Sequence, residues 1–179
     1  MKWIALALVG ALTSCAAAVT PPTKSSATAI AAPHASFAGY QTFSFGLSDP
    51  PKAGYDATPR SLEVQRRLRT VVLAALQQRG YVADDAGAGD LVVKIAAGTG
   101  RDIYKGGQTM GERAIATGLA QGFIGIDIYD RSTGSEVWQG SAFAEIDPAN
   151  INDSLLEMGV DHMLKDFPAR ASGGVATSR

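Results

Sequence analysis

The chain of 179 residues is poor in the side chains from which most catalytic and metal sites are built. It has two histidines, His34 and His162, and one cysteine, Cys15, so an internal disulfide is excluded and no cluster has the spacing of metal ligands. Its 16 Lys and Arg balance 17 Asp and Glu, which is not the basic character of a nucleic-acid-binding protein. No metal, cofactor or nucleic-acid partner is therefore expected.

The first fifteen residues have the pattern of a bacterial lipoprotein signal. After one lysine, residues 3–12 form an apolar run that is too short to span a bilayer core of ~30 Å as a helix. The run leads into Leu12-Thr-Ser-Cys15, which resembles the lipobox, where an aliphatic residue and two small residues precede a cysteine. The resemblance implies cleavage between Ser14 and Cys15 and lipidation of Cys15. An ordinary secretory signal, cut at the small residues 16–18, is the alternative.

A disordered tether is expected to follow this signal peptide of residues 1–14. The next stretch is mainly alanine, threonine, serine and proline, so a lipidated N-terminus and disordered linker are predicted for residues 15–36. The residue after the cysteine is Ala16, and not the aspartate associated with inner-membrane retention, so we expect an outer-membrane lipoprotein facing the periplasm. One folded domain is predicted for residues 37–168, followed by a disordered tail, residues 169–179.

Hydrophobic periodicity predicts six elements in the order βαβββα. Apolar residues at every second position, as at Ile124, Ile126 and Ile128, are typical of strands with one buried face. Strands are predicted at 40–45, 91–97, 123–129 and 136–146, helices at 62–79 and 151–167, and connections at 46–60 and 81–90. Thr58 or Ser61 is expected to cap the first helix, which agrees with a proline at position 59.

These elements predict an α+β two-layer sandwich. A four-stranded, mainly antiparallel sheet carries both helices on one face, where Gly140, Ala142 and Ala144 leave room for close packing. The other face is expected to be more exposed and of mixed polarity, with Asp127 pointing to solvent. The alternation does not decide which face Trp138 occupies, since its neighbour Val137 competes for the core.

Short motifs run through the predicted domain in a fixed order. They are Tyr40-x-Thr-Phe43, Arg66 to Gly80-Tyr81, Ala88-Gly-Asp90-Leu-Val-Val93, Gly125-x-Asp127-Ile-Tyr-Asp130, Thr133-Gly134, Val137-Trp138-x-Gly140 and Phe167-Pro168. Taken together, they resemble the bacterial lipoprotein family called "domain of unknown function 4136" over residues 37–168. The resemblance implies a small α/β sandwich on the cell envelope, and it implies no catalytic residues.

The glycine-rich segment 98–122 is the candidate binding loop. It lacks the Gly-Lys-Ser/Thr ending of a P-loop and the third glycine of a dinucleotide fingerprint, so a nucleotide is not expected. A long hairpin with a mobile tip is predicted instead. Its side chains Arg101, Tyr104, Lys105 and Arg113 are of kinds found at protein interfaces, and they are predicted to contact a partner protein in the envelope. A loop without a role is the alternative.

Candidates for catalysis are few. His162 has Asp166 four positions later, the spacing of neighbours on one helix face, and this pair is the best site for a hydrolase or ligand-modifying enzyme. Three arginines within residues 66–69 form either an anion-binding patch or a solvated helix face. No catalytic residue is predicted. The favoured function is a non-catalytic binding or assembly module held at the membrane by lipidated Cys15, and a periplasmic enzyme with a site near His162 is the alternative.

Overall fold

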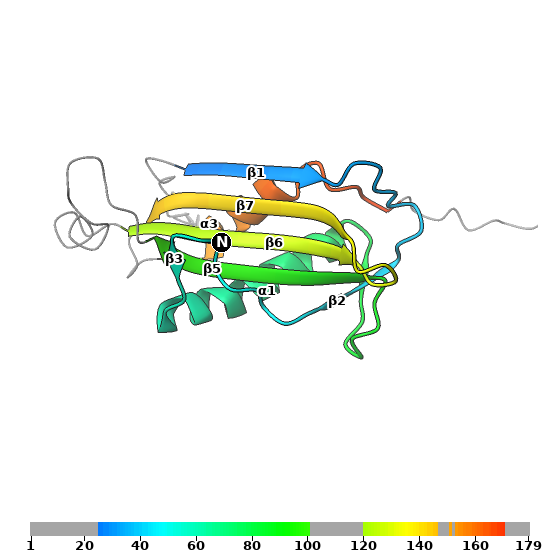
Figure 1. Ribbon diagram of the computed structural model, residues 1–179, viewed down its shortest axis with the longest axis horizontal. Helices are drawn as coiled ribbons and strands as arrows, with labels where there is room; N and C mark the ends of the chain where they lie inside the picture. Colours follow the sequence, from blue (N-terminus) through cyan, green and yellow to red (C-terminus); the bar gives the residue numbers. More distant parts are fainter. Residues whose placement is uncertain (1–24, 101–119, 147–150, 152, 171–179) are drawn as a thin grey trace, which may run out of the picture.

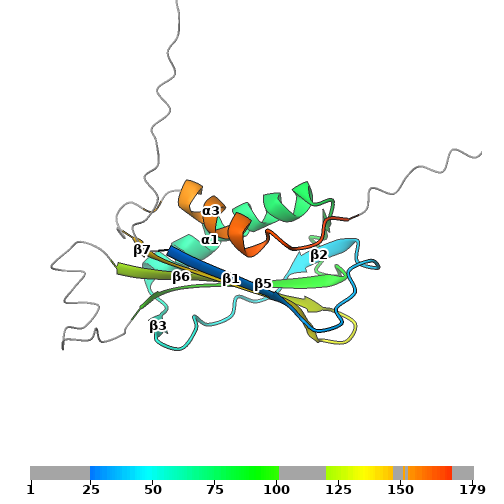
Figure 2. The same cartoon turned by 90° about the horizontal axis from the view of Figure 1, so that it is seen from above.

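In the computed structural model the described residues are 25–100, 120–146, 151 and 153–170, and they form one sheet with two helices on one face (Figures 1 and 2). The strands are β1 Ser25–Ala31, β2 Thr42–Phe45, β3 Tyr55–Asp56, β4 Val82–Ala83, β5 Leu91–Gly100, β6 Ala120–Asp130 and β7 Glu136–Ile146. The helices are α1 Pro59–Gln78 and α3 Asp153–Met163. The predicted α+β class is confirmed.

The predicted four-stranded sheet is too small. Among the described residues the sheet has seven strands in the order β1-β7-β6-β5-β2-β4, with β3 paired to β5. It is mixed, because β2 runs parallel to β5 and β4 while β5, β6, β7 and β1 pair antiparallel. The parallel pairing of β2 with β5 arises because α1 connects them as a crossover helix. The two-residue strands β3 and β4 lie within predicted connections and are too short to produce a periodic signal.

The predicted disordered linker is wrong for residues 25–31. These residues form β1, which pairs with β7 along its whole length, from Ser25 opposite Ala144 to Ala31 opposite Trp138. Six of its seven residues are exposed, so the strand is held by its backbone pairing and buries little side-chain surface. Residues 1–24, including Ser14 and Cys15, lie outside the described part of the chain. Their cleavage and lipidation remain predictions.

Helix α1 begins with a complete capping box. The hydroxyl of Thr58 accepts from the backbone N–H of Ser61 at 3.1 Å, and the hydroxyl of Ser61 accepts from the backbone N–H of Thr58 at 2.7 Å. Thr58 is therefore the cap, with Pro59 at the first helical position. Gly80 follows the C-terminal cap with a φ of +88°, a conformation that favours glycine. The helix turns an apolar stripe towards the sheet: Val64, Leu68, Val72, Ala75 and Leu76.

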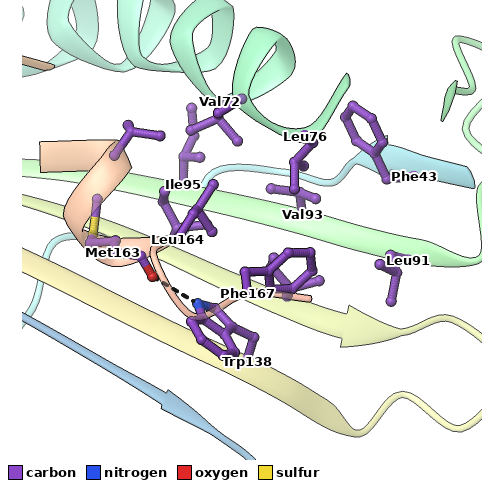
Figure 3. Close-up of a cluster of buried hydrophobic side chains, with 14 of the residues drawn as sticks. Phe43, Val72, Leu76, Leu91, Val93, Ile95, Trp138, Met163, Leu164 and Phe167 are labelled. Carbon is purple, nitrogen blue, oxygen red and sulfur yellow. Dashed lines mark hydrogen bonds between the residues drawn. The ribbon is translucent and has the colours of Figure 1, made fainter. Parts of the chain in front are cut away.

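The main core lies between the helices and one face of the sheet (Figure 3). Trp138 belongs to this face, because its indole N–H donates to the backbone oxygen of Met163 at 3.2 Å and its ring meets Phe167 edge-on at 5.2 Å. Gly140 lies two residues on, where a Cβ would come within 3.0 Å of the Met163 Cβ. The expected close packing of a helix over Gly140 is thus present, and it is made by the end of α3.

The opposite face carries a smaller aromatic cluster at one end. Tyr55 of β3 packs against Phe123 and Phe143 at ring-centroid distances of 5.2 and 5.7 Å. Farther along, Lys94 and Asp127 pair across β5 and β6, with both side chains half-buried. This face is accordingly of mixed polarity, although Asp127 is less exposed than the alternation predicts.

Candidate functional site

Side chains on the helix-covered face become smaller from one end of the sheet to the other. Directly paired residues of antiparallel strands share a face, so the register sorts them into rows across β5, β6, β7 and β1. One row is large: Val93, Ile128, Trp138 and Ala31. At the end of the sheet Ile146 pairs with Ala120, and its side chain lies over Gly122. The row before that pair is small: Thr99, Gly122, Ala144 and Ser25. The space under the helices is therefore underfilled at this end.

The underfilled end is a partly open cavity of about 450 Å³. It lies beneath the first turns of α1 and beside α3, and the sheet forms its floor. Its apolar lining includes Val64, Ala97, Ile124, Ala142, Ala144, Leu155, Leu156 and Gly159. Protein interiors rarely contain voids much larger than a water molecule, whereas ligand sites typically have volumes of about 300 to 1,000 Å³. We take this cavity as the candidate functional site.

The polar groups around the cavity do not converge on a reacting centre. The hydroxyls of Thr58 and Ser61 are engaged in the capping box, and Ser61 also donates to the Thr58 carbonyl at 2.8 Å. Arg60 and His162 are the ionisable side chains among the described lining residues, and no acidic residue stands with them there. Over the described ranges, no three His, Cys, Asp or Glu residues are placed to hold a metal ion. This arrangement suits apolar binding better than bond cleavage.

The predicted pair of His162 and Asp166 is not assembled. His162 lines the cavity, but α3 ends at Met163, so Asp166 lies beyond the helix and the helical spacing no longer applies. Both side chains are exposed, and no ion pair joins them in the described structure. The Leu164 N–H still donates to the Val160 carbonyl at 2.8 Å, but the Phe167 N–H donates to the Leu164 carbonyl at 3.0 Å, so the chain turns where Asp166 lies.

The three arginines at positions 66–69 do not form a joint anion-binding patch. Arg66 pairs with Glu63 on the same helix. Arg67 joins α1 to the start of α3, since its guanidinium donates to the Asp153 carboxylate at 2.7 Å. Arg69 lies over the ring of Phe45, 4.1 Å from its centroid. Each arginine therefore has a separate structural contact.

The remaining predicted site residues fall outside the described chain. These are the loop residues Arg101, Tyr104, Lys105 and Arg113. What the structure describes of segment 98–122 is its two ends, which extend the flanking strands to Gly100 and from Ala120, as the hairpin prediction expects. Both ends stand beside the cavity, because Thr99 and Ala120 are part of its lining.

A row of polar side chains crosses three strands on the opposite face of the sheet. Lys94, Asp127 and Gln139 are in register, and the ammonium group of Lys94 reaches Asp49 at 3.3 Å. Burial, together with the charge of Glu136, raises the pKa of Asp127 to about 6, although hydrogen bonding by Gln139 and the charge of Lys94 oppose the shift. A perturbed carboxyl group in a polar cluster is a secondary candidate for function, but no described cavity surrounds it.

A second polar network fastens the end of the sheet farthest from the cavity. The Tyr40 hydroxyl donates to Asp130 at 2.8 Å, and hydrogen bonds from Ser132 and Tyr40 lower the pKa of Asp130 to about 2. Burial and the same bond to Asp130 raise the pKa of Tyr40 to about 12. Arg131 donates to the Gly89 carbonyl and the Ser44 hydroxyl, both at 2.6 Å. These groups bind one another, so the network is structural.

Sequence reasoning missed the cavity. Its signal was the small residues near the ends of three long strands, but their significance depends on a register that aligns Thr99, Gly122 and Ala144 in one row. The interpretation of Ala144 as room for a helix was incomplete, because at this end the room is left open.

Comparison with known proteins identifies the family. Residues 30–169 match the model described as "Domain of unknown function (DUF4136)". The chain belongs to this family. The match covers both helices and the described strands except residues 25–29 of β1, so it includes both polar networks and the cavity lining apart from Ser25, Ser26 and Ala27. No curated protein matches this DUF4136 chain.

Solved structures share the fold at low sequence identity. A PelC dodecamer from Paraburkholderia phytofirmans is 12% identical, with a TM-score of 0.53 over 83% of this chain and 100% of the other. A PDZ domain protein from Parabacteroides distasonis is 17% identical, with a TM-score of 0.52 over 86% of this chain but 38% of the other. At these identities the likeness establishes the fold alone. In the part of the DUF4136 chain that the structure describes, no helix is long and apolar enough to cross a membrane.

Proposed function

We propose that this chain is an envelope lipoprotein that acts as a non-catalytic binding module, with the apolar cavity as its binding site. The observation that carries the proposal is the cavity of about 450 Å³, whose lining is mainly apolar and in which the Thr58 and Ser61 hydroxyls are already engaged in a helix cap. A site of this kind holds an apolar group and has no arranged acid, base or nucleophile to transform it.

Membrane anchoring in the proposal rests on the N-terminal sequence and on the family. The lipobox-like Leu12-Thr-Ser-Cys15 precedes a DUF4136 domain that begins near residue 30. Several acyl chains on one N-terminus would hold a protein stably at a bilayer. The outer membrane, with the domain facing the periplasm, is the proposed location because Ala16 follows the cysteine. Lipidated Cys15 would thus keep the cavity close to a lipid surface.

Protein contacts are a further part of the proposal. Arg101, Tyr104, Lys105 and Arg113 belong to the segment that joins β5 to β6, and the described ends of that segment stand beside the cavity. A partner held by these side chains would therefore be close to a ligand in the cavity. A periplasmic hydrolase with His162 as its base is the second candidate, since His162 lines the same cavity.

Site-specific crosslinking in intact cells tests the binding function. A photoreactive amino acid is placed at Met158, which lines the cavity and is 42% exposed, and in a control chain at Leu47, which is 89% exposed and outside the lining. We expect a defined adduct from position 158 and none from position 47. The substitution Ala144→Phe, which fills the cavity floor, should remove the adduct. Absence of any adduct at position 158 would refute the binding module.

The same experiment separates binding from hydrolysis. In the chain with the photoreactive residue at position 158, His162→Ala should leave the adduct yield unchanged if His162 has no catalytic role. A hydrolase would instead retain its uncleaved substrate in that variant, so the adduct yield would rise. Asp161→Ala, an exposed neighbour on α3 that is outside the lining, is the matched control.

A further inference from the structure

The size, lining and charge of the cavity narrow the class of ligand. We infer that the cavity binds the acyl chain of a single-chain anionic lipid, a fatty acid or a lysophospholipid, with the acidic headgroup beside Arg60. The inference rests on the proposed binding function and adds the chemical class of the ligand. Its evidence is the row of small residues across the sheet, the mainly apolar lining of the cavity, and the ion pairs that, among the described residues, Arg66 and Arg67 make but Arg60 does not.

The floor of the cavity is wide enough to accommodate part of an extended acyl chain. Its floor crosses β5, β6, β7 and β1 at the row of Thr99, Gly122, Ala144 and Ser25. Three strand spacings of about 4.8 Å make this row about 14 Å long. The cavity floor therefore spans about 14 Å across the sheet, and residues of α1 and α3 bound it from above.

Neither an empty space nor water satisfies the apolar part of the cavity lining. An empty apolar cavity destabilises a fold because the atoms that line it lack packing partners. A buried water needs two to four polar partners, whereas Ala97, Ile124 and Ala142 present carbon atoms to the cavity. A flexible chain of methylene groups satisfies the lining better than either, since it can follow an irregular slot of small aliphatic residues.

The charge at the rim favours an acidic headgroup. Arg60 lies in the first turn of α1 and is exposed at the cavity lining. No acidic side chain among the described residues pairs with it, whereas Arg66 and Arg67 of the same helix bind Glu63 and Asp153. The described lining holds no Asp or Glu that would repel an anion. Carboxylate and phosphate are the groups that a guanidinium binds best.

A competing occupant is the chain's own lipid. Ser25 lines the cavity, and the ten residues 15–24 separate it from the predicted lipidated cysteine. Fully extended, ten residues reach at most about 35 Å. An acyl chain on Cys15 would be within reach, so the experiment must distinguish it from a free lipid.

Photoaffinity labelling of the full chain in cell membranes tests the inference. The probes are fatty acids and lysophospholipids of increasing length with a photoreactive group at the end of the acyl chain, together with the matching uncharged fatty alcohols. Labelled residues are mapped by mass spectrometry of peptides. We expect the labels on cavity-lining residues such as Ile124 and Leu156, with apparent affinity rising about fourfold for each added methylene until the chain outgrows the slot.

Two pairs of variants control for indirect effects. Ala144→Phe should abolish labelling, whereas Thr28→Phe, an exposed residue of β1 outside the lining, should not. Arg60→Gln should weaken labelling by the acidic probes up to about fivefold, the range of an exposed ion pair, and leave the alcohols unchanged. Arg66→Gln on the same helix should affect neither class of probe.

Each alternative outcome has a distinct meaning. Labels spread over the exposed surface, or an affinity that keeps rising with acyl-chain length without a limit, would overturn the inference. Equal labelling by the acidic probes and the alcohols would overturn the inference that the ligand is anionic. Labelling that occurs only in the Cys15→Ala variant would show that the chain's own lipid fills the cavity. A protein adduct from position 158 without lipid labelling would leave the binding module standing and remove the lipid. Failure of both experiments would refute both proposals.

Discussion

Asp90 and Thr42 bind each other reciprocally across 48 residues of sequence. The Asp90 carboxylate accepts from the backbone N–H of Thr42 at 2.9 Å and from its hydroxyl at 3.0 Å, and the Thr42 hydroxyl oxygen accepts from the backbone N–H of Asp90 at 2.9 Å. Thr42 and Asp90 come directly before Phe43 and Leu91, which are the first pair of the parallel β2–β5 ladder. Their hydrogen bonds therefore secure the start of this pairing. Two of the motifs that resemble the family therefore meet to hold the fold together.

Replacing Asp90 should destabilise the fold without affecting ligand capture. Asp90→Ala removes a charged acceptor of three donors, including the backbone N–H of Gln41, and should lower the free energy of unfolding by about 1 to 3 kcal/mol. Urea denaturation measures the loss, with exposed Asp85→Ala as the control. Equal stability of the two variants would contradict the assigned role.

The Asp90 contribution should disappear in acid. Backbone hydrogen bonds from Gln41 and Thr42 lower the pKa of Asp90 in the folded chain. The stability from this group is therefore fully present above the unfolded pKa of about 3.9, and it is lost as the pH falls through the lower folded value. The difference in unfolding free energy between the native chain and Asp90→Ala should shrink below about pH 4.

Asp127 should have the opposite pH dependence. Its folded pKa is raised from 3.8 to about 6, mainly by burial and then by the charge of Glu136, so the folded chain binds the proton more tightly than the unfolded chain. Stability should therefore fall as the pH rises through this window. Asp127→Asn should stabilise the fold at pH 7 by about 1 kcal/mol, after allowance for screening at a half-buried site, and should have little effect below about pH 4.

A matched substitution checks this assignment. Asp161→Asn makes the same chemical change at an exposed position of α3 and should leave the pH profile of unfolding unaltered. Thermal melts of both variants between pH 4 and pH 8 are the measurement. A native-like profile for Asp127→Asn would mean that the Asp127 carboxyl is solvated, as the alternation along β6 had predicted.

The elements with long periodic signals were predictable from sequence. Ile124, Ile126 and Ile128 repeat at the period of a strand, and each faces the helices in the structure. The start of α1 was predictable for a different reason, because Thr58 and Pro59 are residues whose backbone chemistry favours a helix terminus. In both places a local signal and the tertiary packing agree.

The features that depend on distant partners were not predictable. Apart from Ile30, Ser25–Ala31 has small side chains without alternation, and its strand exists because β7 offers an edge to pair with. His162 and Asp166 have helical spacing in sequence, but the turn after Met163 separates them. The cavity depends on the register of four strands, which no single segment encodes. Each of these is a tertiary effect that overrides a local pattern.

Loss of the predicted lipid attachment should change the location of the protein. Cys15→Ala removes the thiol that lipidation requires, so the chain should appear as a soluble species or as an uncleaved precursor. Cell fractionation and the mass of the N-terminal peptide distinguish these results. Ser14→Ala keeps a small residue before the cysteine and is the matched control. A Cys15→Ala chain that remains firmly in the outer-membrane fraction would refute anchoring through Cys15.

Filling the cavity should stabilise the fold and remove the ligand. Ala144→Leu adds three carbon atoms to the underfilled row, and at about 0.8 kcal/mol for each buried methylene the gain is at most about 2.4 kcal/mol. The same change at Ala75, which is 5% exposed in the packed core, should instead lower stability by about 1 to 3 kcal/mol through overpacking. Thermal and urea unfolding of the two variants measure this opposite response.

The two substitutions are expected to change the stability of the fold in opposite directions, and this makes the comparison decisive. Both variants replace alanine by leucine under the same helices, so their difference in stability reports whether space is available at each position. If Ala144→Leu is stabilising and also loses photolabelling, the open row is kept at the expense of stability because a ligand needs it. If Ala144→Leu destabilises the fold as Ala75→Leu does, the row is closed in solution and the cavity is not a binding site.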